Sequence, residues 1–185
     1  MIRRACFINT LIARVAGLLH VHVHRPQAED NIRLRPVRIS DASFMHSGFV
    51  SDNFLVANCL TRPITSSRFL TWLWIKRSFA YSYCILADGE RAGFLGLHSL
   101  QPCATAEISL ALFKEDMRRK GYGRRAFQIF ADEFEKHNFV KKIVVRVARD
   151  NFIYLSFWRT LGFKEIHREH SVRTLLYSKK QRVVE

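Results

Sequence analysis

The chain has few cysteines, few acidic residues and no long uninterrupted apolar run. Its four cysteines form no Cys-x-x-Cys pair and no short cluster with histidine, so neither a zinc site nor a disulfide framework is indicated. A reducing, cytoplasmic environment fits this usage. Arg14 interrupts the apolar N-terminal stretch and leaves it too short for a transmembrane helix. No internal repeat or low-complexity segment appears.

The scarcity of acids gives the chain a strong positive charge. Sixteen Asp and Glu residues stand against 30 Lys and Arg, for a formal net charge of +14. This balance favours an anionic ligand, substrate or partner and disfavours a polycationic one. The length of 185 residues and the 48% hydrophobic content predict one globular domain with a sizeable core.

Residues 1–30 differ from the rest and are predicted to be an N-terminal extension of unclear role, outside a domain of residues 31–185. The stretch has arginines, many apolar residues and no acid before Glu29, a composition found in targeting and membrane-surface segments. No small-residue cleavage pattern is clear, however. His20, His22 and His24 alternate and would share one face of a strand. They could bind a metal or lie in solvent as an incidental repeat. We favour the second interpretation and predict no metal site.

From residue 31 onward, strand and helix patterns alternate. Helical patterns run from a cap at Ser40 and Asp41 to about Phe79 with a break near Arg62-Pro63, from Arg124 to about Asn138, and from Asn151 to a stop at Gly162. In the second helix, Phe127, Phe130, Ala131 and Phe134 define one buried face. Strands are predicted at 32–37, on both sides of an Asp88-Gly89 hairpin turn, and at 105–113, 141–148, 163–170 and 171–178. The chain is therefore predicted to be an α/β (α+β) protein.

The stretch "RRKGYGRRAF", residues 118–127, combines glycines, cations and a helix start. Gly121 and Gly123 would let backbone N–H groups approach a ligand closely, and the N-terminus of the following helix adds a positive dipole. The surrounding cations are Arg118, Arg119, Lys120, Arg124 and Arg125. Cations are unfavourable at a helix N-terminus unless an anion binds there. The stretch predicts a diphosphate site; the alternative is a solvated basic turn.

Two other phosphate-binding motifs fail on context. Gly121-x-Gly123-x-x-Ala126 fits the dinucleotide fingerprint, but it follows an antiparallel meander and a charged spacer instead of the first strand of a parallel unit. A nucleotide-hydrolysing P-loop is excluded because no Lys-Ser/Thr follows the second glycine.

The residues match a known family. Arg118-x-x-Gly121-x-Gly123 resembles the acetyl-CoA signature, Arg/Gln-x-x-Gly-x-Gly/Ala, of the GNAT family of N-acetyltransferases. Asn151 with Gly162-Phe163, eleven and twelve positions later, resembles the second motif of that family. The resemblance covers about residues 31–178. It implies the GNAT fold, a mixed and mostly antiparallel sheet of six to seven strands flanked by about four helices.

The resemblance also implies a cofactor site for acetyl-CoA as co-substrate. The backbone edge at Leu112-Phe113 would pair with the pantetheine arm, and Asn151 would hydrogen-bond that arm, cap a helix, or do both. The pyrophosphate would be held by the backbone amides of Arg119, Lys120, Gly121, Tyr122, Gly123 and Arg124, with Arg118 as the first residue of the signature.

One departure from the family concerns the proton donor. The position that often carries a tyrosine, which protonates the departing thiolate, is Trp158 here, and an indole N–H is too weak an acid. Tyr154 shares its helical face and could substitute, or could be a packing aromatic. We expect Trp158 to form a wall against the pantetheine.

The attacking amine must also lose a proton. Glu107 is the first candidate base, because the family often places a glutamate on this strand; the alternative is an exposed structural carboxylate. Strand alternation puts Glu107, Ser109 and Ala111 on one face.

The acceptor is predicted only as a class, the primary amine of a protein N-terminus or of a small molecule. The segment 51–73 resembles the branch of ribosomal-protein N-terminal and nucleotide-sugar amine acetyltransferases, so a ribosomal protein or nucleotide sugar is a candidate partner. Two rival functions stay open: a degenerate transferase that binds CoA without turnover, and a basic RNA- or ribosome-binding module. Nucleic acid is not expected as a specific partner, because the cations form no contiguous array with aromatics. A homodimer is left open.

Overall fold

The computed structural model describes residues 27–29, 31–57, 60–79, 81–99, 101, 105–136 and 141–178. Most of the predicted N-terminal extension, with His20, His22 and His24, lies outside these residues, as does the predicted helix end at Asn138. No helix in the described part of the chain is long and apolar enough to cross a lipid bilayer.

One mixed sheet organises the described residues. It has eight strands there, in the order β1-β2-β3-β4-β5-β6-β8-β7. Neighbouring strands run antiparallel except β5 and β6, which are parallel. The strands are β1 (Gln27–Glu29), β2 (Ile32–Pro36), β3 (Ser82–Ala87), β4 (Glu90–His98), β5 (Thr105–Leu112), β6 (Lys142–Ala148), β7 (Lys164–Arg168) and β8 (Val172–Ser178).

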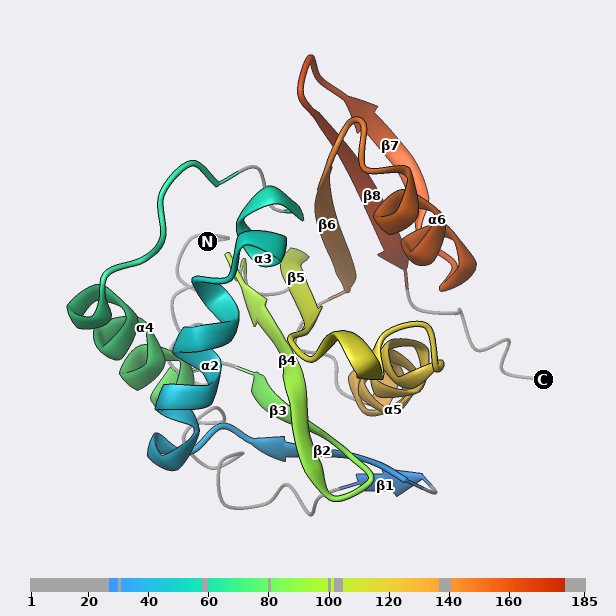
Figure 1. Ribbon diagram of the computed structural model, residues 1–185. Coiled ribbons are helices and arrows are strands. Elements are labelled where there is room, and N and C mark those ends of the chain that lie inside the picture. The colour runs from blue at the N-terminus through green and yellow to red at the C-terminus, as the bar shows by residue number, and fades with distance from the viewer. Residues whose placement is uncertain are drawn as a thin grey trace, which may run out of the picture.

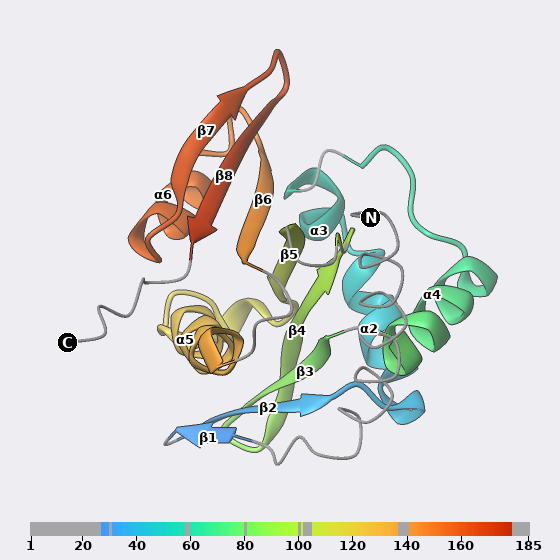
Figure 2. The same cartoon turned by 180° about the vertical axis from the view of Figure 1, so that it is seen from behind.

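Helices cover both faces of the sheet. Figures 1 and 2 show α2 and α4 on one face and α5 on the other, while α6 lies beside β7 and β8. The helices are η1 (Ile39–Asp41), α2 (Ala42–Phe49), α3 (Asp52–Ala57), α4 (Ser66–Phe79), η2 (Glu115–Met117), α5 (Tyr122–Lys136) and α6 (Phe152–Thr160). This arrangement confirms the predicted GNAT-like α/β fold, with the short β1 added at the sheet edge.

Two apolar clusters follow from the two covered faces. The larger lies between the sheet and α5, whose four predicted inward residues, Phe127, Phe130, Ala131 and Phe134, are all buried. The smaller lies between the sheet and helices α2 and α4 and includes Met45, Phe69 and Leu73. The sheet thus separates two packed layers.

Most of the predicted elements are present, and one region differs. The Asp88-Gly89 turn joins β3 and β4, with φ of +51° and +82° at its two residues. Gly162 has φ of +91° just beyond α6, as expected of a helix stop. The predicted helix from Ser40 and Asp41 onward is wrong in two respects. The Asp41 side chain does not cap α2, because its carboxylate accepts a hydrogen bond from the Arg38 amide ahead of η1. A second break, near Ser51, separates α2 from α3. The hydroxyl of Ser51 accepts a hydrogen bond from the Phe54 amide at 3.4 Å, so Ser51 caps the start of α3.

Candidate active site

The first component of the site is an open strand edge. β5 pairs with β6 only at Thr105–Glu107, opposite Lys142–Val144. Beyond Glu107 the edge of β5 that faces β6 has no strand paired with it in the described structure. Because the Phe113 amide bonds to the Ala92 carbonyl of β4, alternation directs the backbone groups of Ile108 and Leu110 to this open edge. A ligand with amide groups can therefore hydrogen-bond to the edge as an added strand would.

This geometry corrects the predicted position of the edge. Phe113 does not contribute to it, because its amide is bonded to β4 and its ring packs against Phe49 and Phe44. The carbonyl of Leu112 faces the open side, but it accepts a hydrogen bond from Arg118 Nε at 3.2 Å. The free backbone groups lie two and four residues earlier than predicted.

The second component is the loop between β5 and α5. Arg119 and Gly121 both have left-handed backbones, with φ of +61° and +83°, and α5 begins at Tyr122. Alternating backbone conformations of this kind point successive N–H groups into one concavity, where an anion can bind. A Cβ at Gly121 would meet only the Arg125 guanidinium, at 3.8 Å, so backbone conformation rather than crowding requires glycine there. At Gly123 a Cβ would touch Leu110 and a ring carbon of the α6 residue Phe157, both at 3.5 Å.

The cations around this loop fall into two groups. Arg125 is tied down: its guanidinium donates to the Asn31 side chain at 2.8 Å and lies over the Tyr122 ring. Asn31 in turn donates to Asp88, which also accepts a hydrogen bond from the Tyr122 hydroxyl. This network fixes the start of α5 to the β3–β4 turn, so Arg125 is structural rather than part of the predicted ring of free charge.

The second group is available to a ligand. The side chains of Arg119, Lys120 and Arg124 are exposed and have no hydrogen bond or ion pair to another described residue. They lie on or next to the loop with the left-handed backbones. The loop therefore offers three free cations and a helix N-terminus to an anion.

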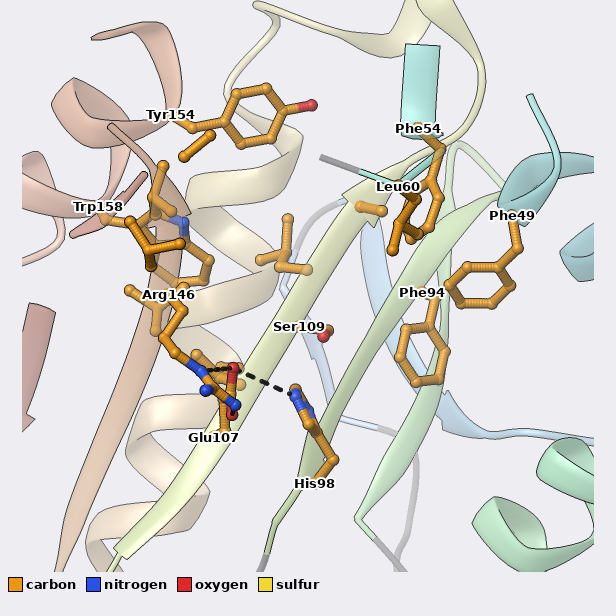
Figure 3. A pocket seen from close by; sticks show the side chains of 17 residues that line it. Phe49, Phe54, Leu60, Phe94, His98, Glu107, Ser109, Arg146, Tyr154 and Trp158 are labelled. Atoms are coloured by element: carbon orange, nitrogen blue, oxygen red, sulfur yellow. Dashed lines mark hydrogen bonds and ion pairs between the residues drawn. The ribbon is translucent and has the colours of Figure 1, made fainter. Parts of the chain in front are cut away.

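The third component is a cleft of about 450 Å³ where β5 and β6 diverge. Tyr154 and Trp158 of α6 line it, and Figure 3 shows the Tyr154 hydroxyl pointing across the cleft toward the side of Phe54. Asn151 caps α6, accepting a hydrogen bond from the Tyr154 amide at 3.3 Å, so the capping role predicted for Asn151 is present. Trp158 is only 3% exposed and packs edge-on against Phe163 and the α5 residue Phe127. Trp158 is thus mainly a core residue with one side on the cleft.

Glu107 lies at the floor of this cleft in an ionic cluster. Arg146 of β6 donates to both of its carboxylate oxygens, at 2.9 and 2.6 Å, and His98 Nε2 lies 3.5 Å from Oε1 (Figure 3). Burial raises the pKa of Glu107, but hydrogen bonds from His98 and Arg146 outweigh burial and lower that pKa to about 2. The residue is 9% exposed, so the alternative of an exposed carboxylate is wrong. A paired carboxylate of such low pKa is a weak base.

A second cavity of about 520 Å³ adjoins the cleft. It lies against α4 and the chain before it. The two spaces share one wall, formed by Phe49, Phe54, Leu60, Phe94, His98 and Ser109. Two compartments that meet at a polar His-Ser pair can hold two reactants with their reactive groups adjacent.

The sequence had not singled out His98 or given Arg146 a site role. His98 joins the site because it lies directly opposite Glu107 in the β4–β5 register, and Arg146 because β6 runs parallel next to β5. The alternation that places Glu107 and Ser109 on one face was the available signal. It could not reveal which residues lie opposite them, because register is set by pairing between distant strands. The described residues hold no group of three or more His, Cys, Asp or Glu side chains suited to a metal ion.

Comparison with known proteins assigns the family. The model of the acetyltransferase (GNAT) domain family matches residues 31–164, and the chain therefore belongs to this family of acetyl-CoA-dependent N-acetyltransferases. No curated protein matches the chain.

Solved structures agree with this fold at low sequence identity. A domain from Methanocaldococcus jannaschii is 15% identical, with a TM-score of 0.71 over 81% of this chain and 99% of that one. Spermidine N-acetyltransferase from Vibrio cholerae, solved with CoA and spermine, is 18% identical, with a TM-score of 0.68 over 82% and 97%. The Salmonella typhimurium acetyltransferase that modifies the N-terminal serine of ribosomal protein L7/L12 is 16% identical, with a TM-score of 0.65 over 82% and 97%.

Proposed function

We propose that this chain binds acetyl-CoA along the open edge of β5 and transfers the acetyl group to a primary amine at the wall shared by the cleft and the second cavity. The observation that carries this proposal is the position of the open edge, which runs from Ile108 toward the loop at Arg119–Gly121. The pantetheine amides would bond to Ile108 and Leu110. The pyrophosphate would lie on the amides of residues 119–124, next to the free cations Arg119, Lys120 and Arg124.

The reaction needs one group to accept a proton and one to supply a proton. The neutral amine nitrogen attacks the acetyl carbonyl carbon, a C–N bond forms, and the C–S bond then breaks to release the thiolate of CoA. The proton lost by the attacking nitrogen goes to a base, and the thiolate takes a proton from an acid or from water.

We assign the base to His98 in place of Glu107. The His98 imidazole has a ring nitrogen that can accept a proton, whereas Glu107 is held as a carboxylate by Arg146. His98 also lines both spaces, where it can reach an acceptor amine. Glu107 then acts as a positioning residue, since its carboxylate next to Nε2 favours a proton on that nitrogen and leaves the other free to accept one.

Tyr154 remains the proposed acid. Its phenol is in the cleft, while the neighbouring Trp158 supplies only an indole N–H in a packed aromatic environment. The thiolate of CoA is a good leaving group and can also take a proton from water. Under this proposal, Tyr154 therefore accelerates the reaction, but the reaction can proceed without it.

An acceptor panel with thiol release as the readout tests the function. Transfer to at least one class of primary amine, with acetyl-CoA bound stoichiometrically, supports the enzyme. Stoichiometric binding of acetyl-CoA without transfer to peptides, polyamines, amino sugars or aromatic amines would instead identify a degenerate transferase.

A matched pair of histidine variants tests the proposed base. His98→Gln should lower kcat on the order of a hundredfold while acetyl-CoA binding is kept, because a positioned base is lost. His167→Gln is the control, since His167 is exposed on β7 and lines neither space. Equal rates for the two variants would remove His98 from the mechanism.

A further inference from the structure

The second cavity has an unusual balance of charge. Three cationic side chains line it, Arg62, Arg68 and Lys76, and its described lining contains no acidic residue. None of the three lines the cleft, so they belong to the part of the cavity away from the proposed cofactor path. An acceptor in this cavity therefore meets positive charge beyond the wall where its amine would react.

Two of these cations are not neutralised by the protein. Arg62 and Arg68 are exposed, and neither makes a hydrogen bond or ion pair with another residue in the described ranges. Most other arginines near the sheet are paired, as Arg146 is with Glu107 and Arg35 is with Asp41. The guanidinium groups at the cavity thus keep all five of their donors available for a carboxylate or phosphate.

Lys76 is the inner cation of the set. Its Nζ donates to the carbonyl of Leu97 at 2.5 Å, next to His98 in the chain, and burial lowers its pKa to about 8. A single carbonyl occupies one of its three donors. A partly buried ammonium without a carboxylate partner among the described residues is unfavourable, and an anionic group on a bound ligand would stabilise it.

The rest of the cavity lining is mostly apolar and rich in aromatic residues. Phe69 and Trp72 stack with ring centroids 5.6 Å apart, and Phe49 meets Trp72 edge-on at 5.0 Å. These rings line the cavity together with Phe94. The walls fit an apolar or aromatic body, and the only Lys, Arg, Asp or Glu side chains of the described lining are the three cations; Thr65, His98 and Ser109 are its other polar residues.

Resting on the function proposed above, we propose that the acceptor is an anionic amine: a primary amine on an apolar or aromatic body that carries a carboxylate or phosphate, which Arg62, Arg68 and Lys76 bind. The same cations disfavour the ammonium form of the acceptor, because like charges lower the pKa of an amine held near them. The positive cavity therefore selects the anionic group and promotes the neutral amine that attacks. Polyamines, with several positive charges and no anion, are excluded on the same grounds.

Matched acceptors that differ by one charge test this inference. Tyrosine against tyramine compares a carboxylate with its absence, and O-phosphotyramine against tyramine makes the comparison for phosphate. A tripeptide amide, Ser-Phe-Glu against Ser-Phe-Gln, places the anion on a peptide N-terminus, and spermidine is the polycation. In at least one pair, we expect kcat/KM for the anionic member to exceed that for its neutral partner by on the order of tenfold. This ratio should decrease as the salt concentration is raised. The small-molecule and peptide arms distinguish the source of the acceptor.

Charge-removing variants connect the preference to the cavity. Arg62→Gln, Arg68→Gln and Lys76→Met should each reduce the ratio of kcat/KM for the anionic acceptor to kcat/KM for its neutral partner, because each removes one positive charge from the cavity. Arg33→Gln is the matched control, because Arg33 is an exposed arginine of β2 that lines neither space. Circular dichroism and acetyl-CoA affinity establish that each variant is folded.

The outcomes separate this inference from the proposed function. If acetylation occurs but neutral amines or spermidine are used as well as the anionic acceptors, the function stands and the anionic acceptor is wrong. If no acceptor in the panel is acetylated, the proposed function fails. Calorimetric titration of the same acceptors in the presence of CoA then tests whether the second cavity binds anionic amines. If the anionic member of a pair binds and Arg68→Gln weakens that binding, the inference is supported. If the anionic member does not bind, the inference is overturned.

Discussion

Replacing Glu107 by glutamine removes the charge at the centre of the β4–β5–β6 junction. The carboxylate pairs with Arg146 on one side and His98 on the other. Its pKa is lowered from 4.5 to about 2, which corresponds to about 3 kcal/mol of folding free energy at about 1.4 kcal/mol per pKa unit. The Arg146 side chain is 60% exposed, and solvent screening of that partner reduces the expected loss for Glu107→Gln to about 2 kcal/mol at pH 7.

The pH dependence of this loss has a definite sign. The folded state holds Glu107 ionised more strongly than the unfolded chain, whose carboxyl titrates near pH 4.5. The stabilisation is therefore complete above pH 4.5 and is lost as the pH falls from there toward 2. The difference in unfolding free energy between wild type and Glu107→Gln should shrink to about half or less by pH 3.

Urea denaturation followed by circular dichroism at pH 7, 5 and 3 measures this difference. Glu169→Gln is the matched control: Glu169 also lies beside a histidine, His167, at 3.3 Å, but both side chains are more than half exposed. An exposed pair contributes at most about 1 kcal/mol, so the control should change stability little. A Glu107→Gln protein as stable as wild type, or a loss that does not change with pH, would refute the assignment of Glu107 to a strong internal ion pair.

Three further tests concern the loop before α5, the proposed acid and the fold. Gly121→Ala and Gly162→Ala both place an alanine at a positive φ and should each cost about 1 kcal/mol of stability, but only Gly121→Ala should weaken acetyl-CoA binding, measured by calorimetry; equal affinities would remove the loop from the cofactor site. Tyr154→Phe should keep acetyl-CoA affinity and lower kcat on the order of a hundredfold in a thiol-release assay, whereas normal turnover would leave Tyr154 as a packing residue. Asp41→Asn should destabilise the protein by about 3 kcal/mol in urea denaturation, because Asp41 is fully buried and Arg35 donates to both of its oxygens at 2.6 and 2.7 Å; an unchanged midpoint would contradict that role.

The Asp88–Tyr122 contact explains how the loop before α5 is held in place. Tyr122 is the first residue of α5, and its hydroxyl binds Asp88 in the turn between β3 and β4. Arg125 adds a second link through Asn31. The helix N-terminus is thereby joined to the sheet by side chains, so its amides are held in position before a ligand arrives, which lowers the ordering cost of binding.

The local elements and the family followed from the sequence by itself. Alternation and periodicity depend only on neighbouring residues. They located β2 to β8, the Asp88-Gly89 turn and the buried face of α5, but not β1, which lies in the predicted extension. The loop at Gly121 was predicted for the same reason, since a left-handed backbone and a helix start are properties of a short segment.

The reactive centre was decided only by the tertiary structure. His98 comes next to Glu107 through the β4–β5 register, and Arg146 reaches the same carboxylate from a parallel strand that follows a whole helix later in the chain. These contacts turn a candidate base into a strongly paired anion. No local pattern encodes them, because the protonation of a group depends on burial and on charges brought close by the packing of distant segments. The same holds for Arg62, Arg68 and Lys76, which line one cavity only because α4 and the chain before it pack over the sheet.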